Sequence, residues 1–212
     1  ISSDCKGTDI YPDKKTMKFQ VECNGKTFDD LRLNMGGVYN VMNAVASVSV
    51  ANLLDVNSSK IIDGINTFMG IRRRFETHIS SDKLVFIDDY AHHPKEVKEC
   101  INAVKQMYPE RKITVVFQPH LYSRTKDFMN EFANSLSLAD ELILLDIYGA
   151  REKEIEGVSS KVLLNKCTNL KKELSSLDSV VEKIADKEID VLLTLGAGDI
   201  STIIEPLRLR LS

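Results

Sequence analysis

Two carboxylates and two imidazoles stand close together directly after an apolar run, residues 84–87. They are the side chains of Asp88, Asp89, His92 and His93. A carboxylate beside an imidazole can orient the ring, fix its tautomer and hold its pKa near the pH at which a proton is transferred. Capping of a helix that starts at Pro94 accounts for one or two of these residues but not for four. The segment therefore predicts an active site.

A second polar segment follows the next apolar run, residues 113–117, and contains His120 and Arg124. An arginine in such a turn can hold a carboxylate or a phosphate with two parallel hydrogen bonds. A surface salt bridge is the ordinary role of a single arginine, but the histidine-rich turn nearby favours a functional one. Open α/β sheets bind ligands at the carboxyl ends of their strands, so both segments are expected at one rim.

Three consecutive arginines, Arg72, Arg73 and Arg74, precede Phe75. A charge run of this kind is usually solvated. A domain boundary is predicted just after it, near Thr77, which suggests that one arginine points into a cleft and meets an anionic ligand.

A buried helix is predicted over residues 39–54, because nearly every side of it is apolar. Its exceptions are Asn40, Asn43 and Ser47, which share one face at spacings of three and four residues. Such a stripe either joins a buried hydrogen-bond network or faces a ligand.

Strands and helices alternate from His78 onward, with strands expected over residues 84–87, 113–117, 141–147 and 190–195. One helix begins at Pro94, one carries Phe128, Phe132 and Leu136, and one closes the chain after the turn 196–198. This alternation predicts an α/β domain with a mostly parallel sheet. Before it, Asn24-Gly25 indicates a hairpin, and a second helix is expected over residues 59–69. Residues 149–180 remain unassigned.

Composition narrows the class of protein. The 212 residues carry a net charge of −3 and are 43% apolar, which suits a globular protein and leaves no electrostatic footprint for nucleic acid. No apolar run is long enough for a membrane span and no signal peptide opens the chain.

The four cysteines of the chain include no Cys-x-x-Cys pair, so free thiols of a reducing cytosol are expected, with no structural zinc site. Because the first residue is Ile1 and a phosphate loop is absent, the chain is expected to be a piece of a longer protein.

In this order, the motifs resemble those of the Mur ligases of peptidoglycan synthesis. The resemblance rests on residues 36–44, 72–75, 88–94, 117–125 and 196–200. It implies that residues 1–77 are the end of a central ATP-binding α/β domain and that residues 78–212 form a Rossmann-like carboxyl-terminal domain. The His-His-Pro and Gln-Pro-His elements resemble the branch that adds alanine.

By this resemblance, the longer protein is a cytoplasmic, ADP-forming ligase. ATP and Mg²⁺ would convert the carboxylate of UDP-N-acetylmuramate into an acyl phosphate, and the amine of L-alanine would attack it. The phosphate loop and the usual magnesium ligands would lie upstream, so this chain holds no assigned metal ligand and is expected to be inactive alone.

The resemblance also implies a nucleotide-binding group of residues. Asn40 and Asn43 would face the adenine of ATP, and Arg74, with Arg73 beside it, would meet the phosphates. Asp89 would help to bind the nucleotide and close the carboxyl-terminal domain over it.

A second implied group would act on the other substrates. His92 would take the proton of the incoming amine, and His120 and Arg124 would hold the alanine carboxylate or the acyl phosphate. Two residues depart from the family pattern: Tyr39 stands where histidine is usual, and Leu121 where arginine is common.

Three alternatives stay open. A cell-wall recycling ligase of the same family would attach a whole tripeptide, although the Gln-Pro-His element argues against it. A metal-dependent hydrolase would use Asp88, Asp89, His92 and His120 as ligands. A non-catalytic nucleotide sensor would lose no enzymatic function without Asp89.

Overall fold

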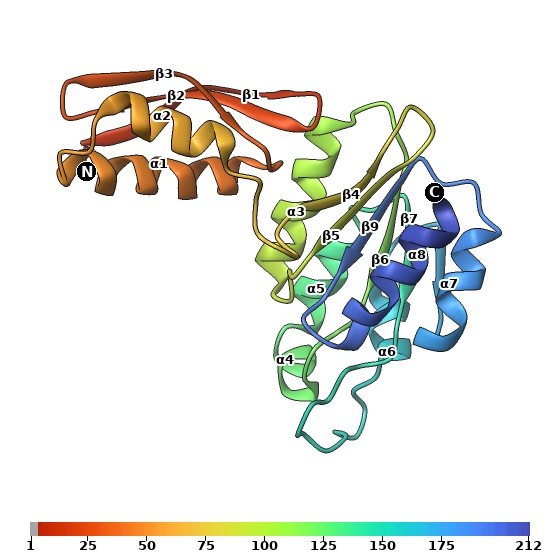
Figure 1. Ribbon diagram of the computed structural model, residues 1–212. Coiled ribbons are helices and arrows are strands. Elements are labelled where there is room, and N and C mark those ends of the chain that lie inside the picture. Colours follow the sequence, from red (N-terminus) through yellow and green to blue (C-terminus); the bar gives the residue numbers. More distant parts are fainter. Residues whose placement is uncertain (1–3) are drawn as a thin grey trace.

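Two β-sheets organise the chain, which a computed structural model describes over residues 4–212 (Figure 1). The small sheet is antiparallel and consists of β1 (Cys5–Asp13), β2 (Thr16–Cys23) and β3 (Lys26–Leu33). Helices α1 (Val38–Leu53) and α2 (Ser58–Thr67) pack on it and enclose a core of their own. The turn at Asn24-Gly25 is confirmed, since both residues have the positive φ that a tight hairpin requires.

The large sheet has six strands in the order β4-β5-β9-β6-β7-β8. Its strands are β4 (Glu76–Ser80), β5 (Val85–Asp89), β6 (Ile113–Phe117), β7 (Glu141–Leu144), β8 (Lys171–Leu174) and β9 (Val191–Leu195). Only β4 is antiparallel to its neighbour, so the predicted α/β class with a mostly parallel sheet is confirmed. The strand nearest the end of the chain, β9, lies between β5 and β6.

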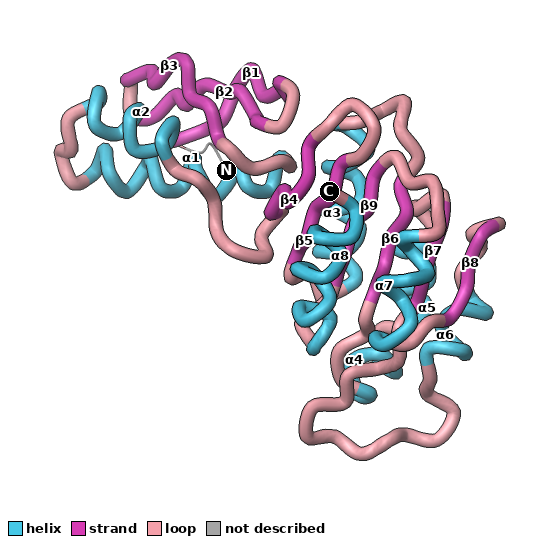
Figure 2. Tube along the Cα trace, turned by 45° about the vertical axis from the view of Figure 1, so that its right-hand side comes forward, coloured by secondary structure: helices cyan, strands magenta, loops and turns pink. Residues whose placement is uncertain are grey.

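Helices cover both faces of the large sheet (Figure 2). One face packs against α3 (Pro94–Met107), α5 (Met129–Leu136) and α6 (Ser160–Lys166), and the other against α7 (Leu177–Ala185) and α8 (Ile204–Leu211). Two short elements complete the set, α4 (Tyr122–Asp127) and the 3₁₀ helix η1 (Asp199–Ile203). Across residues 4–212, none of these helices combines the length and the apolarity that crossing a membrane requires.

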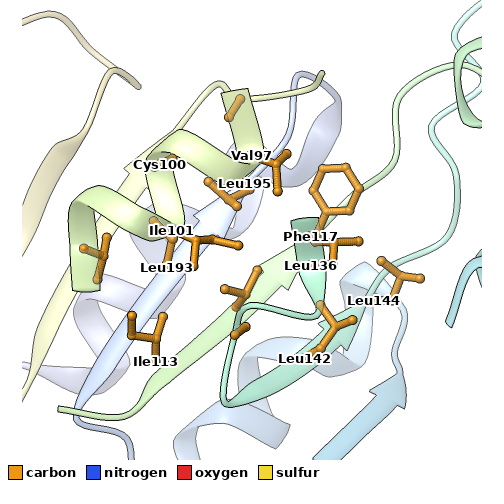
Figure 3. Close-up of a cluster of buried hydrophobic side chains, with 14 of the residues drawn as sticks. Val97, Cys100, Ile101, Ile113, Phe117, Leu136, Leu142, Leu144, Leu193 and Leu195 are labelled. Atoms are coloured by element: carbon orange, nitrogen blue, oxygen red, sulfur yellow. The ribbon is translucent and has the colours of Figure 1, made fainter. Parts of the chain in front are cut away.

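The three central strands are completely buried, because helices cover both of their faces. Figure 3 shows this core, with Ile101 of α3 next to Leu193 of β9 and Leu136 of α5 next to Phe117 of β6. This core fixes the carboxyl ends of the strands, where the polar segments begin.

Several element boundaries differ from those predicted. The helix expected to carry Phe128, Phe132 and Leu136 is divided, because Phe128 has φ −115° and ψ 24° and ends α4. Its ring packs instead against His93, with the ring centroids 4.7 Å apart. The unassigned residues 149–180 contain α6, β8 and the start of α7. Short length and few apolar residues hid these elements from the sequence pattern.

The expectation of four free thiols is wrong, because Cys5 and Cys23 form a disulfide. They are 18 residues apart in sequence, but the antiparallel pairing of β1 and β2 places them directly opposite each other. Cys100 and Cys167 are free and buried.

The predicted change of domain near Thr77 falls within β4, which begins at Glu76 and belongs to the large sheet. The division of the chain into domains 1–77 and 78–212 therefore stays a prediction.

Removing the ring of Phe132 should destabilise the large sheet. The side chain is fully buried and lies 5.5 Å from the Phe117 ring, so Phe132→Ala leaves a cavity. We expect the free energy of unfolding to fall by about 3–5 kcal/mol in urea titrations. Leu209→Ala, at a side chain that is 65% exposed, is the control and should change it by less than about 0.5 kcal/mol. A loss below about 1 kcal/mol for Phe132→Ala would contradict this core.

Candidate functional site

Three parallel strands end side by side at one edge of the large sheet. Asp89 of β5, Leu195 of β9 and Phe117 of β6 are in register, so the turns that follow them share that edge. The two polar segments predicted to form one rim are thus brought together, although β9 separates their strands. The His92 and His120 ring centroids lie 6.2 Å apart across it.

Asp89 is almost fully buried, and both of its carboxylate oxygens accept hydrogen bonds. Oδ1 accepts from the amide of Ala91 at 2.8 Å, and Oδ2 accepts from the amide of Phe75 at 2.7 Å. The Tyr39 hydroxyl, from α1, also donates to Oδ2 at 3.3 Å. Burial raises the pKa of Asp89 to about 6, although the two amides lower it and so oppose the shift. This carboxylate joins three segments of the chain.

The contact between α1 and the large sheet is close. A Cβ atom on Gly36 would lie 2.2 Å from the Phe75 ring, so only glycine fits before α1. Burial is the main cause of the raised pKa of the Tyr39 hydroxyl, and the nearby Cys100 and Asp89 add to it. Tyr39, the departure noted in the sequence, therefore acts here as a neutral donor to Asp89.

The two arginines assigned to phosphate differ in their surroundings. Arg73 is committed to the fold: its Nε donates to Asp88 Oδ2 at 2.9 Å, and its Nη2 donates to the Gly196 carbonyl at 2.6 Å. Arg74 is exposed, and within residues 4–212 it has no carboxylate partner. It lies against the Tyr90 ring, with its guanidinium carbon 5.8 Å from the centroid. Arg74 is therefore the cation that remains available to an anion.

His92 is partly exposed and has a defined tautomer. Its Nδ1 lies 2.9 Å from the Tyr90 carbonyl, which only accepts hydrogen bonds, so Nδ1 carries the proton. The lone pair of Nε2 is then free to accept a proton. Glu96 Oε2 lies 3.5 Å from Nδ1 and would stabilise the ring once it is charged.

His93 caps α3, as the alternative interpretation of its position predicted. Its ring accepts from the Lys95 amide, and Glu96 accepts from the amides of His92 and His93. Glu96 follows His93 by three residues, which is the capping-box spacing, so the sequence carried a signal for it.

His120 has the opposite tautomer. Arg124 Nη1 lies 3.3 Å from His120 Nδ1, and a guanidinium only donates, so Nδ1 accepts and Nε2 carries the proton. Burial, helped by the charge of Arg124, holds the pKa of His120 below its ordinary value. The ring stacks on Tyr148, with centroids 5.6 Å apart. In the part of the chain that the structure describes, Arg124 has no carboxylate partner.

Gln118 was not among the predicted site residues, yet it organises the neighbouring turn. Its Nε2 donates to Asp199 at 2.6 Å and its Oε1 accepts from the Ile200 amide at 2.9 Å. Gly196, with φ 145°, lies so close that a Cβ there would be 2.8 Å from the Gln118 carbonyl oxygen. The turn 196–198 therefore packs closely on Gln118. Tyr148 was also missed, and no sequence pattern pointed to it.

The predicted asparagine stripe lines a pocket of about 280 Å³ between α1 and α2. Asn40 is buried and its Nδ2 donates to the Gly36 carbonyl at 2.7 Å, which leaves Oδ1 able to accept. Asn43 and Ser47 are exposed beside it. The other walls are mostly apolar and come from α2, β3 and the segment that follows α2. No residue of the large sheet lines this pocket, so the structure does not join the stripe to the histidines.

The four residues that would bind a metal ion in the alternative hydrolase do not lie together in the structure. Within residues 4–212, only one group of at least three possible metal-ligand atoms has all of its members within 4.8 Å of one another. It consists of Glu76, His78 and Asp88. Asp89, His92 and His120 are absent from it, so the structure gives the hydrolase no support.

Comparison with known proteins finds close similarity. A family model described as "Mur ligase, glutamate ligase domain" matches residues 73–198. The UDP-N-acetylmuramate–L-alanine ligase of Cytophaga hutchinsonii is 42% identical over 96% of this chain and 46% of that protein. The enzyme of the same name from Parabacteroides distasonis is 44% identical over 88% of this chain and 42% of that protein.

A solved structure agrees with these relatives. The UDP-N-acetylmuramate-alanine ligase of Thermotoga maritima has a TM-score of 0.82 and 26% identity, and the similarity covers 99% of this chain and 46% of that chain. This chain thus spans less than half the length of the proteins it matches.

Replacing Asp89 should change how stability depends on pH. Because its pKa is raised when folded, the carboxyl stabilises the fold while protonated, below about pH 4, and loses that contribution as pH rises through about 6. Relative to Asp89→Asn, the wild type should be more stable at pH 4 than at pH 7 by about 2 kcal/mol, because at pH 4 the carboxyl is protonated in the folded chain but already partly ionised in the unfolded one. Chemical denaturation at both pH values measures this difference.

The exposed Asp82 provides the control for that experiment. Asp82→Asn should follow the wild-type profile. Equal pH profiles for the wild type and Asp89→Asn would contradict the burial of an ionisable carboxyl at this position.

Proposed function

The chain belongs to the Mur ligase family, and we propose that the protein containing it adds L-alanine to UDP-N-acetylmuramate in peptidoglycan synthesis. The observation that carries this proposal is the arrangement at the ends of β5 and β6. An imidazole able to accept a proton lies beside one able to donate, and a guanidinium without a carboxylate partner adjoins them. Two relatives that bear the name of this ligase match nearly all of the chain.

The amine step needs a base and an anion site. An ammonium group must lose a proton before its nitrogen can attack, and His92 would accept that proton at Nε2, since its Nδ1 already donates to the Tyr90 carbonyl. Arg124, together with the Nε2–H of His120, would hold the alanine carboxylate. Since carboxylate and amine belong to one small molecule, both sites must lie close together, as these two histidines do.

The first step would use ATP to form an acyl phosphate, and the described residues fit part of that nucleotide. The pocket beside Asn40 and Asn43 has apolar walls for an adenine ring, and Asn40 Oδ1 remains free to accept from its amino group. Arg74 would meet a phosphate, whereas Arg73 would act indirectly by fixing the segment that carries Arg74. Asp89 would act where α1 meets the large sheet, and its three donors hold that junction closed.

Mg²⁺ would neutralise phosphate charge in this reaction. Mg²⁺ prefers oxygen ligands in octahedral geometry. Within residues 4–212, the one group of candidate ligands includes a histidine, whose ring nitrogen fits Mg²⁺ poorly. We therefore place the magnesium ligands in the rest of the longer protein and expect this chain to be inactive alone. Because the reaction consumes ATP, we place it in the cytoplasm.

Phosphate release by the longer protein tests the proposal. With ATP, Mg²⁺ and UDP-N-acetylmuramate present, we expect release that depends on added L-alanine and not on the cell-wall tripeptide. Dependence on the tripeptide would support the recycling ligase instead. Phosphate release that depends on neither L-alanine nor the tripeptide, or no release at all, would overturn the ligase proposal and favour a nucleotide sensor.

His92→Gln separates the two chemical steps. Glutamine preserves a donor toward the Tyr90 carbonyl but offers no basic nitrogen. We expect alanine-dependent turnover to fall by about 10²–10⁴-fold, while ATP-dependent formation of the acyl phosphate stays within a few-fold of wild type. Trapping the acyl phosphate by reduction with borohydride measures the first step independently.

His93→Asn is the matched control, because asparagine can cap α3 in place of the neighbouring imidazole. It should leave both steps close to wild type. Normal turnover by His92→Gln, or an equal loss in both steps, would remove His92 from the role of base.

A further inference from the structure

A histidine and two carboxylates meet where the edge strand β4 joins β5. They are Glu76 and His78 of β4 and Asp88 of β5, and one ligand atom from each lies within 4.8 Å of the others. Glu76 Oε2 and His78 Nε2 are 3.8 Å apart, which is too long for a hydrogen bond. The roles proposed for the ligase use neither Glu76 nor His78, and Asp88 enters them only as the partner of Arg73.

The nitrogen of His78 that faces the cluster is buried and unsatisfied. The side chain of His78 is only 16% exposed, and its Nε2 atom has no hydrogen-bond partner among residues 4–212. The ring is held in place against Phe86, with centroids 5.2 Å apart. A buried polar atom without a partner costs free energy, and native proteins seldom tolerate one unless an ion or water completes it.

The backbone aims these three side chains together. Glu76 pairs directly with Asp88 across the antiparallel strands, and the register shifts between Thr77 and Ile79. His78 is therefore the additional residue of a β-bulge, a feature that commonly redirects a side chain. Its ring is turned toward the pair formed by Glu76 and Asp88.

Neighbouring donors orient both carboxylates. Thr194 donates to Asp88 Oδ1 at 2.7 Å, and Arg73 Nε donates to Asp88 Oδ2 at 2.9 Å. The Arg73 amide donates to Glu76 Oε2 at 2.8 Å. Each carboxylate oxygen has two lone pairs, so every one of them keeps capacity for a metal ion. Such outer contacts are typical around metal ligands.

The charges leave the cluster attractive to a cation. Two carboxylates oppose one guanidinium, so one negative charge remains while the imidazole is neutral. Donors of one nitrogen and two oxygens suit Zn²⁺, which binds histidine and carboxylates about 2.0–2.2 Å away. Donor atoms around tetrahedral Zn²⁺ lie roughly 3.4 Å apart, and Glu76 Oε2 and His78 Nε2, at 3.8 Å, are close to that separation.

We propose that Glu76, His78 and Asp88 bind a divalent transition-metal ion of the Zn²⁺ class, which clips β4 to β5. The site is distinct from any magnesium site for ATP, because Mg²⁺ avoids imidazole nitrogen. It is independent of the proposed ligase activity. The metal site lies beside Arg73, so the ion would sit where the chain passes from the arginine triplet into the large sheet.

Metal content tests the site in the longer protein. Metal-free protein is dialysed against ZnCl₂ with excess MgCl₂, and bound zinc is measured by mass spectrometry. We expect the wild type to hold one more Zn²⁺ per chain than His78→Gln. His93→Asn is the control and should hold as much as the wild type. Equal zinc in the wild type and His78→Gln, or displacement of the ion by Mg²⁺, would overturn the proposal.

Two further measurements guard against a variant that fails to fold. Glu76→Gln keeps the shape of the side chain and should weaken Zn²⁺ binding at least 10-fold by calorimetry. Zn²⁺ at 100 times its Kd should shift the unfolding equilibrium of the wild type about 100-fold and leave that of His78→Gln unchanged. A shift of equal size in both proteins would place the ion elsewhere, for example at His92 and His120.

Discussion

The buried carboxylate of Asp89 is the constraint on which the rest of the site depends. It accepts hydrogen bonds from Phe75, Ala91 and Tyr39, which belong to the segment before β4, the turn after β5 and helix α1. A charge in this position is costly unless such donors surround it, so the three segments hold one another in place. The two sheets are therefore joined through a polar group and not only through apolar packing.

Around this junction, neighbouring residues of the same type have different roles. Asp88 and Arg73 form a nearly buried ion pair that also holds the turn after β9, whereas Arg74 remains exposed. In the same way, His93 caps a helix while its neighbour His92 keeps a free ring nitrogen. Side chains of identical chemistry thus become structural or reactive according to whether the fold supplies them with partners.

The opposite tautomers of His92 and His120 follow from equally simple contacts. A carbonyl oxygen faces one ring and a guanidinium faces the other, so one imidazole is prepared to accept a proton and the other to donate. The first contact lies within the turn after β5, and the second joins the turn after β6 to α4, while the strand order sets the distance between the rings.

The sequence by itself determined the alternation of strands and helices, the hairpin at Asn24-Gly25, the family motifs and the two polar turns, because periodicity and turn chemistry are local. It missed α6 and β8, whose patterns are short, and the Cys5–Cys23 pair, whose partners meet only when β1 and β2 align. Only the tertiary structure placed β9 between β5 and β6, packed Gly196 against Gln118 and committed Arg73 rather than Arg74 to an ion pair. Contacts between distant segments depend on how whole elements pack, and no local pattern of residues specifies them.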